Sequence, residues 1–266
     1  MPELPEVETV VAGLRPRLTG DRMRSVETLW HRSLCGDPRE VTRRIRGRRI
    51  GKMFRRGKYI CLDLEGPHLT IHLRMSGRLV FNPSPAEERH IRARLHFHES
   101  PCLALVDPRK FGRIRLWDSD ETFLPGLGPD PLDAKTVADA LAGLTSRRPI
   151  KTVLLDQKVL AGIGNIYADE ALFSARIHPL TPAGDLDENQ RARLSATVPL
   201  ILKEAIRRRG TTLNDYRDPD NRDGGFQHQL KVYQCAGKPC SVCGTPISRI
   251  VVGQRGTHFC PRCQKK

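Results

Sequence analysis

Apolar residues follow two different periods along this chain of 266 residues. From residue 2 to residue 18 they recur three or four positions apart, at Leu4, Val7, Val11, Leu14 and Leu18. That spacing places them on one face of a helix. We therefore expect the chain to begin with an amphipathic helix that packs one side against the rest of the protein.

A period of two begins after Gly20 and is clearest over 91–98, where apolar and polar residues alternate. Such alternation predicts strands with one buried side. Several short strands of this kind are typical of a β-sandwich or barrel. We expect strands over 26–30, 59–64, 69–73, 79–81, 91–98, 103–106 and 114–117.

The helical period returns in the second half of the chain, after a segment rich in proline, glycine and acidic residues that we interpret as a linker. A glycine turn, Gly162-Ile163-Gly164, joins two of the expected helices. It fits a plain helical hairpin or a DNA-docking motif whose second helix offers free N–H groups to phosphate. The polar loop 211–229 is expected to be mobile, and its length suits a ligand-gated element. The expected helices span 137–144, 153–160, 166–173 and 194–206.

The charge of the chain favours a polyanionic partner. Lys and Arg number 45 against 30 Asp and Glu, a net charge of +15, and arginines cluster over 43–49, 55–58 and 207–209. A large, clustered positive charge suits nucleic acid better than a merely soluble surface. No apolar run approaches the roughly 18 residues of a membrane span, and the start does not resemble a signal peptide. We expect a cytoplasmic, nucleoid-associated protein without membrane contact.

Four of the eight cysteines form two CxxC pairs near the end of the chain, Cys240 with Cys243 and Cys260 with Cys263. The 16 residues between the pairs match the spacing of zinc ribbons. Four thiolates fill a tetrahedral site and leave no position for water, so we predict one structural Zn²⁺. Arg255 lies between the pairs, as a solvated charge or a phosphate ligand.

Pro2 is a candidate nucleophile, because removal of Met1 before a small residue would expose a secondary amine. An α-amino group ionises about two pH units below lysine, so part of it is unprotonated at neutral pH. Such an amine can attack an electrophilic carbon and form an iminium. The alternative is that Pro2 and Pro5 only begin a helix, where proline is well tolerated.

The sequence resembles the bacterial formamidopyrimidine-DNA glycosylases over its whole length, and six motifs carry the resemblance. They are 2–9 (PELPEVET), 56–59 (RGKY), 72–77 (HLRMSG), 107–112 (DPRKFG), 162–170 (GIGNIYADE) and 255–260 (RGTHFC). The resemblance implies an α+β multidomain protein. We expect an N-terminal β-sandwich with an amino-terminal helix over 1–118, a linker over 119–131, a helical helix-two-turn-helix domain with a lesion-capping loop over 132–229, and a zinc ribbon over 230–266.

The resemblance also assigns catalytic roles. The amine of Pro2 would attack C1′ of the damaged nucleotide, Glu3 would donate a proton near the sugar, and Lys58 would transfer protons during base release and β-elimination. Arg255 would serve δ-elimination. Because an iminium acidifies the neighbouring C2′ proton, one nucleophile would give both glycosylase and lyase activity.

Other residues would bind DNA and hold the nucleotide outside the stack. Met75, Arg109 and Phe111 match the trio that fills the vacated space, although Met75 in a core and Phe111 in a strand turn would be ordinary placements. Phosphate contact is expected from His72, His90, Arg109, Arg147, Lys151, Asn165 and Arg255.

We therefore expect a monomeric, bifunctional glycosylase and lyase that removes 8-oxoguanine and formamidopyrimidines from duplex DNA. Two alternatives remain, namely an endonuclease VIII-like enzyme for oxidised pyrimidines and a non-catalytic zinc-ribbon DNA-binding protein. Leu4, where the endonuclease VIII group usually has glycine, favours oxidised purines. Two departures from the family pattern are Gln234-Cys235, where relatives usually carry glycine, and the individual sequence of the loop 216–226.

Overall fold

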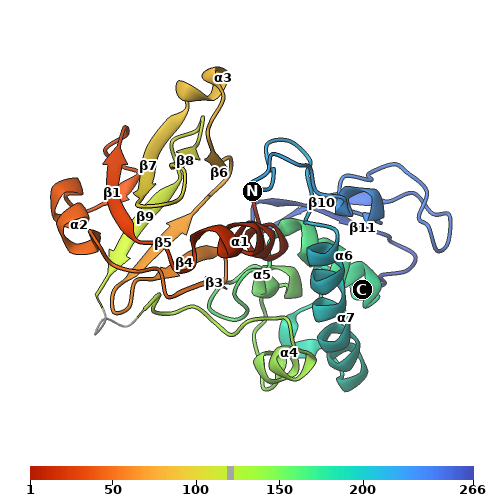
Figure 1. Ribbon diagram of the computed structural model, residues 1–266. Helices are drawn as coiled ribbons and strands as arrows, with labels where there is room; N and C mark the ends of the chain where they lie inside the picture. Colours follow the sequence, from red (N-terminus) through yellow and green to blue (C-terminus); the bar gives the residue numbers. More distant parts are fainter. Residues whose placement is uncertain (119–122) are drawn as a thin grey trace. The chain divides into compact units, whose positions relative to one another are not determined.

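The computed structural model describes residues 1–118 and 123–266 and divides the chain into two compact units (Figure 1). The first comprises Met1–Pro125 and Arg208–Gly225, and the second comprises Gly126–Arg207 and Phe226–Lys266. Residues 119–122 of the expected linker lie outside the described residues. The segment 208–225 belongs to the first unit by its contacts, whereas the sequence assigned it to the helical domain.

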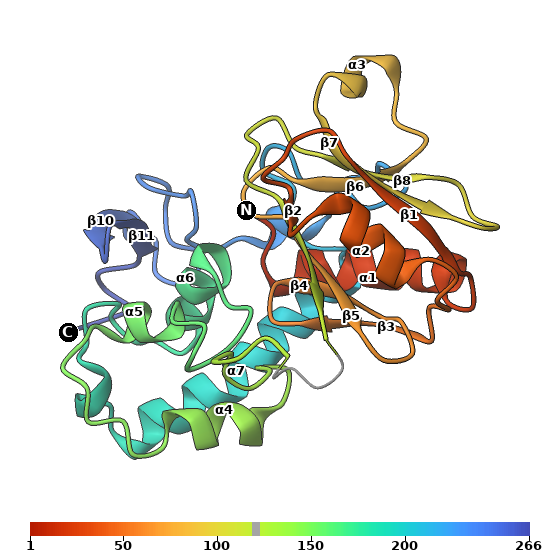
Figure 2. The same cartoon turned by 90° about the vertical axis from the view of Figure 1, so that its left-hand side faces the viewer.

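The first unit is the expected β-sandwich (Figure 2). One sheet contains, in spatial order, β1 (Met23–Thr28), β7 (Ile91–Phe97), β8 (Leu103–Val106) and β6 (Arg78–Phe81). The other contains β2 (Leu34–Cys35), β9 (Arg113–Trp117), β5 (His68–His72), β4 (Tyr59–Asp63) and β3 (Lys52–Arg56). All pairings are antiparallel except that of β2 with β9.

Apolar side chains from both sheets and from α1 (Leu4–Leu18) form one core. In β7 every second residue is buried, which confirms the alternation seen in the sequence. The sequence analysis missed β2, β3, α2 (Pro38–Ile45) and the short α3 (Pro85–Glu88). In α2 only Val41 and Ile45 reach the core, so the hydrophobic signal is two residues among arginines.

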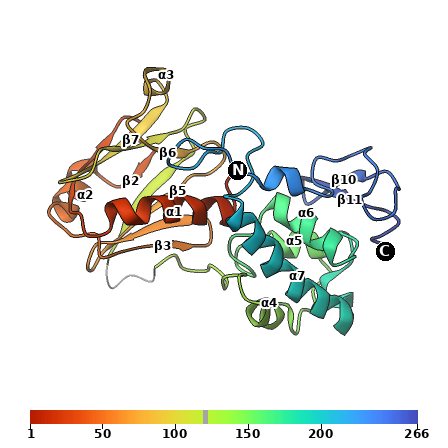
Figure 3. The same ribbon diagram turned by 45° about the vertical axis from the view of Figure 1, so that its right-hand side comes forward.

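The second unit is helical and ends in a two-stranded ribbon (Figure 3). Both α4 (Ala134–Leu141) and α6 (Asn165–Ser174) pack against the long α7 (Glu188–Arg207). The helix expected over 153–160 is instead α5 (Ile150–Leu154), which begins earlier and ends at Leu154. The Asp156 carboxylate accepts the N–H of Lys158 at 3.1 Å, a local turn that competes with further helix. The remaining elements are the 3₁₀ turns Ala183–Asp185 and Phe226–Gln229, and the ribbon strands β10 (Ser248–Val252) and β11 (Arg255–Phe259).

The polar loop expected to be mobile packs partly against the first unit. Tyr216 is buried in the sandwich core, and its hydroxyl donates to the carbonyl of Arg209 at 3.1 Å. Asp218 is also buried and accepts the backbone N–H groups of Asp220 and Arg222. Among the described residues, no helix is long and apolar enough to cross a membrane.

Candidate functional site

The amino-terminal end of α1 buries two residues of the predicted catalytic set, Pro2 and Glu3. The backbone N–H of Glu3 donates to Oε2 of Glu6 at 2.7 Å, which satisfies a donor at the start of the helix. The other oxygen of Glu6, Oε1, accepts the N–H of Thr211 at 2.7 Å. One buried carboxylate therefore fixes the beginning of the chain to the segment 208–225 within the first unit.

Gly210 is required at this junction. Its φ of +79° is strained for other residues, and an added Cβ would lie 2.7 Å from Oε1 of Glu6. The sequence analysis contained Glu6 only within the motif 2–9, and it gave Gly210 no role. A glycine followed by two threonines offers no periodic signal that could have revealed this contact.

Lys58 lies at the turn between β3 and β4, next to Gly57, whose φ is +56°. Its side chain is buried, with 7% exposed. The hairpin is fixed along α1 by Arg55, which donates to Glu8 at 2.9 Å, and by Arg15, which donates to the carbonyl of Met53 at 3.1 Å. These contacts set the turn with Lys58 at the same end of the sandwich as the start of α1.

His72 is opposite Tyr59 in the β4–β5 register, and the two rings meet edge to face at 4.6 Å between centroids. Burial, followed by the charges of Arg74 and Lys58, lowers the pKa of His72 to about 3. The ring is therefore neutral at neutral pH. Since Nδ1 accepts the N–H of Arg74 at 2.9 Å, the proton of the neutral ring is on Nε2. His72 can thus offer a neutral N–H donor.

Met75, Arg109 and Phe111 lie on loops between strands and are all exposed to solvent. Met75 is 42% exposed, so it does not have the core placement that was its ordinary alternative. Phe111 lies in the turn between β8 and β9, which was its ordinary alternative, and its side chain is 43% exposed. The guanidinium of Arg109 is 5.1 Å from the ring centroid of Phe111. Two exposed apolar side chains and an arginine thus stand on neighbouring loops of one sandwich.

Asp107 holds these two loops together and is completely buried. One of its oxygens accepts the Ser76 hydroxyl at 2.5 Å and the N–H of Arg109 at 3.1 Å. The other accepts the N–H groups of Phe111 and Gly112, each at 2.7 Å. The sequence analysis quoted Asp107 within a motif without giving it a role, although a carboxylate before a Pro-Arg-Lys-Phe-Gly turn is a typical acceptor for turn N–H groups.

His90 precedes β7 and is half-buried. Its carbonyl accepts the N–H of Asp107 at 2.8 Å, and its ring Nε2 accepts from Arg89 at 3.1 Å. Arg92 also donates to the carbonyl of Asp107, at 2.7 Å. The backbone of His90 is thus part of the support of the Asp107 loop, alongside any contact its ring makes with phosphate.

The remaining predicted DNA contacts belong to the second unit. Asn165 is the first residue of α6, and its side-chain N–H group donates to the carbonyl of Gly256 at 2.9 Å. Its buried Oδ1 has no hydrogen-bond partner in the described part of the chain. Arg255 begins β11 and is exposed, and Arg147 is exposed in the segment before α5.

Lys151 differs from the expectation of a phosphate ligand, because its side chain is fully buried. Its ammonium donates to Oδ1 of Asp169 and to the carbonyl of Gly256 at 3.3 Å. Oδ2 of Asp169 accepts the N–H of His258 at 2.9 Å. A buried ion pair therefore joins α5, α6 and β11 next to Arg255, the first residue of β11. A lone lysine in an apolar helix was the only sequence sign of this placement.

Glu170, the next residue in α6, accepts the backbone N–H groups of Lys231, Val232 and Tyr233 at 2.9–3.1 Å. Burial raises the pKa of its carboxyl, and the backbone donors oppose that rise. Two adjacent carboxylates of α6 thus hold the ribbon from two sides, Asp169 through β11 and Glu170 through the segment that leads into the ribbon.

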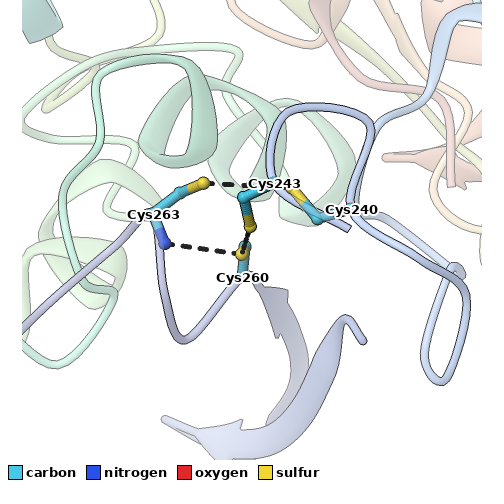
Figure 4. A group of neighbouring side chains, drawn as sticks. All are labelled: Cys240, Cys243, Cys260 and Cys263. Carbon is cyan, nitrogen blue, oxygen red and sulfur yellow. Dashed lines mark hydrogen bonds between the residues drawn. The ribbon is translucent and has the colours of Figure 1, made fainter. Parts of the chain in front are cut away.

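The ribbon brings its four cysteines together (Figure 4). All four sulfur atoms lie within 4.8 Å of one another. The Sγ atoms of Cys240 and Cys263 are 3.9 Å apart, and those of Cys243 and Cys260 are 3.5 Å apart. A tetrahedral ion with Zn–S bonds of about 2.3 Å requires sulfur atoms about 3.8 Å apart. The arrangement fits one structural Zn²⁺, and the prediction of four ligands is confirmed.

Three family models match the chain. The N-terminal domain of formamidopyrimidine-DNA glycosylase matches residues 1–114, and the helix-two-turn-helix domain of that enzyme matches residues 127–217. A zinc finger found in this glycosylase and in isoleucyl-tRNA synthetase matches residues 237–266. Together the three models span most of the chain.

Whole-length relatives agree with these matches. The formamidopyrimidine-DNA glycosylase of Chloroflexus aurantiacus is 47% identical over 99% of this chain and 98% of its own. The crystal structure of MutM (Fpg) from Thermus thermophilus superposes with a TM-score of 0.89 at 43% identity, over 100% of this chain and 99% of that one. A Lactococcus lactis Fpg variant in complex with Fapy-dG-containing DNA has a TM-score of 0.89 at 36% identity, over 100% of both chains. This chain therefore belongs to the formamidopyrimidine-DNA glycosylase family and is a zinc-containing DNA glycosylase of DNA repair.

Proposed function

We propose that the protein is a bifunctional glycosylase and lyase that excises 8-oxoguanine and formamidopyrimidines from duplex DNA. The observation that carries the proposal is the burial of Pro2 and Glu3 at the start of α1, on the same end of the sandwich as buried Lys58. A whole-length relative in complex with DNA that contains Fapy-dG supports the purine substrate. We also expect the enzyme to act as a monomer.

The reaction begins with the amine of Pro2, freed by removal of Met1. Its lone pair forms a bond to C1′ of the damaged nucleotide, the N-glycosidic bond breaks, and the base leaves with a proton. Opening of the sugar ring yields an iminium between Pro2 and C1′. The iminium acidifies the C2′ proton, whose loss breaks the C3′–O bond in β-elimination. A second elimination breaks the C5′–O bond.

Glu3 and Lys58 move the protons of these steps. Glu3 protonates the sugar oxygen as the ring opens, and Lys58 transfers a proton during base release and elimination. Burial favours both roles, because it excludes water and places the groups at fixed positions. The position of Glu3 depends on Glu6, which accepts the Glu3 backbone N–H. Arg255 assists the second elimination and holds the adjacent phosphate.

The exposed loops suit the work of holding DNA open. Rotation of a nucleotide out of the stack costs a few kcal/mol. Met75 and Phe111 provide apolar surface to replace the lost base stacking, and Arg109 provides a positive charge that faces the DNA strand. His72, His90, Arg147 and Asn165 contact phosphate in this proposal. Lys151 serves the proposed function as a positioning residue, because its buried ammonium supports the start of β11, where Arg255 lies.

Borohydride trapping on a duplex with 8-oxoguanine opposite cytosine tests the nucleophile. Reduction of the iminium should give a covalent complex of protein and DNA, and peptide mapping should place the bond on Pro2. A form that retains Met1, verified by mass spectrometry, should bind the duplex and give no adduct at Pro2. Tight binding of the lesion without any adduct in the processed protein would overturn the proposal.

Substrate class is tested separately with matched duplexes that contain 8-oxoguanine, a formamidopyrimidine or an oxidised pyrimidine. We expect faster base release from the two purine lesions. Faster release of the pyrimidine would assign the chain to endonuclease VIII-like chemistry. Lys58→Met should slow base release by about 100- to 10,000-fold, the usual contribution of one proton-transfer group, while an abasic-site analogue still binds.

A further inference from the structure

A surface of arginines lies on α2 and on the chain that follows it, away from the residues assigned to catalysis. Arg43, Arg44 and Arg48 line a hollow of about 300 Å³ together with Pro67 and Asp118. The backbones of Arg22 and Arg49 form an isolated β-bridge, which joins the residue before β1 to this group of arginines. We call the set the arginine surface, and it consists of Arg22, Arg39, Arg43, Arg44, Arg46, Arg48 and Arg49.

The arginine surface and the start of α1 are at opposite ends of the sandwich. After α1 ends, Gly20 donates to the carbonyl of Ile50 and Met23 donates to the carbonyl of Arg48. Pro2 is at the other end of α1, which spans about 22 Å at 1.5 Å per residue. Figure 3 shows α2 beside the end of α1 that is remote from the chain start. The phosphates of the one or two nucleotides next to a nucleotide bound at Pro2 therefore lie too far from α2 to contact it.

Nearby carboxylates offset only part of the positive charge. Glu40 pairs with Arg43, Asp118 pairs with Arg44, and Glu65 pairs with Arg49. These pairs are exposed, so a phosphate can compete for the guanidinium groups at little cost. Arg39 and Arg46 are also exposed, and neither forms an ion pair with another described residue. A net positive surface thus remains after pairing.

The chemistry of this surface selects phosphate in a duplex. Guanidinium groups bind phosphate oxygens with two parallel hydrogen bonds, and such phosphate contacts carry no sequence information. Proteins that hold single strands add aromatic side chains for stacking. The described residues that line the hollow, Arg43, Arg44, Arg48, Pro67 and Asp118, include no aromatic side chain. A double strand also carries one charge per about 1.7 Å of its axis, which matches a dense arginine cluster better than isolated anions do.

We propose that the arginine surface binds a second segment of duplex DNA through its phosphates, while the lesion duplex occupies the site that contains Pro2. One molecule then bridges two duplex segments. Such a contact lets the enzyme pass from one segment to another without full release. The inference adds to the proposed function a second site that performs no chemistry.

Energy transfer between two duplexes tests this bridging. A donor-labelled duplex with an abasic-site analogue is bound first, and an acceptor-labelled undamaged duplex is then titrated. We expect energy transfer with one protein per two duplexes, checked by sedimentation. If four phosphates are contacted, the affinity for the second duplex should fall about 100-fold between 50 and 200 mM salt.

The decisive variant is Arg39→Gln/Arg43→Gln/Arg46→Gln, which changes exposed residues only. It should lose at least 10-fold in affinity for the second duplex and keep its affinity for the abasic duplex. A matched control, Lys135→Gln/Arg176→Gln/Lys203→Gln, removes the same charge from exposed positions of the second unit and should bridge normally. If the protein does not bind the abasic duplex more tightly than an undamaged duplex, the proposed function is wrong. Binding of the abasic duplex therefore distinguishes a failure of the proposed function from a failure of the second DNA site.

Three outcomes would overturn the inference. The first is absence of energy transfer at 50 mM salt. The second is an equal loss of affinity for the second duplex in the arginine-surface variant and in the control variant, which would show that total charge alone governs the energy transfer. The third is a single strand of the same length that competes as well as the duplex does, because it would assign the surface to single-stranded DNA.

Discussion

The sandwich of the first unit and the zinc ribbon of the second both carry exposed residues of the proposed site, yet they hold them differently. Beneath the loops of Met75 and Phe111 lies an apolar core drawn from both sheets and from two helices. The ribbon beneath Arg255 shares a cluster of only five buried residues, Phe173, Val232, Cys240, Ile247 and Cys260, and two of these are zinc ligands.

The difference follows from the free energy that each region gains by burying apolar surface. A fully buried aliphatic side chain contributes about 1.5–3 kcal/mol, so many such residues stabilise a sandwich without further help. Few of them are available in a ribbon of about 30 residues, and modules of that size depend on metal ions or disulfides. The ribbon gains the stability that its small core does not provide from its four cysteines, from the buried Lys151–Asp169 pair beneath β11 and from the hydrogen bonds of Glu170.

Removal of a zinc ligand should show the largest difference between the two regions. Cys260→Ser should lose the metal and unfold the ribbon, because metal binding contributes about 10–16 kcal/mol in small zinc modules. Duplex binding should weaken, while the strands of the sandwich keep their hydrogen-exchange protection. Zinc content and amide exchange measure both effects. Cys235→Ser, outside the ligand group, is the control and should keep one zinc; unchanged duplex affinity in the zinc-free protein would contradict the dependence.

Breaking the buried ion pair should come next. Lys151→Met leaves the carboxylate of Asp169 without its cation, which should lower the free energy of unfolding by about 3–5 kcal/mol. Lys151→Met/Asp169→Asn should recover part of this loss, since the amide can still accept the N–H of His258. Urea denaturation measures both variants. Equal stability of the single and double variants would show that the charge of Asp169 is compensated in another way.

Substitution of Asp107 tests how the loops of the sandwich are held, and we expect a smaller loss of unfolding free energy than for Lys151→Met. Both of its oxygens accept hydrogen bonds, so Asp107→Asn must turn its NH₂ group toward N–H donors on one side. We expect a loss of about 2 kcal/mol in unfolding free energy and weaker binding of lesion duplexes. Ser76→Ala, which removes one donor, should cost about 1 kcal/mol. A neutral Asp107→Asn variant would mean that the loops are fixed by packing alone.

The smallest effect is expected from the pH dependence of His72. Its pKa is about 3 in the folded protein against 6.5 ordinarily, so the unfolded state binds more protons between these values. Stability is therefore lost as pH falls from 6.5 toward 3, by about 1–2 kcal/mol down to about pH 5. His72→Gln should flatten this part of the curve of unfolding free energy against pH. An identical slope in both proteins would assign the loss to other groups.

Local patterns in the sequence were sufficient to predict much of the architecture. Alternation over 91–98 predicts β7, and the spacing of Leu4, Val7 and Val11 predicts α1. The two CxxC pairs predict the zinc site, which the sulfur positions confirm. These features are predictable because one short stretch of chain contains the whole signal, either a period set by backbone geometry or a spacing set by metal coordination.

The sequence analysis was weaker where a charged stretch becomes regular structure. α2 and β3 both contain more arginine and lysine than the usual helix or strand signal tolerates. β3 forms because its register with β4 supplies backbone hydrogen bonds and buries Met53. Those partners lie across a hairpin, so the strand is decided by pairing and not by its own composition.

What the sequence determined by itself is the set of chemically capable groups, including an amine at Pro2, carboxylates, a lysine and four thiols. Tertiary structure alone decided which of them face solvent and which hold the fold. It buried Lys151 against Asp169, gave Asp107 four donors, and joined Glu6 to Thr211 across more than two hundred residues. The physical reason is that the hydration of a charge depends on what packs around it, and residues distant in the sequence supply that packing.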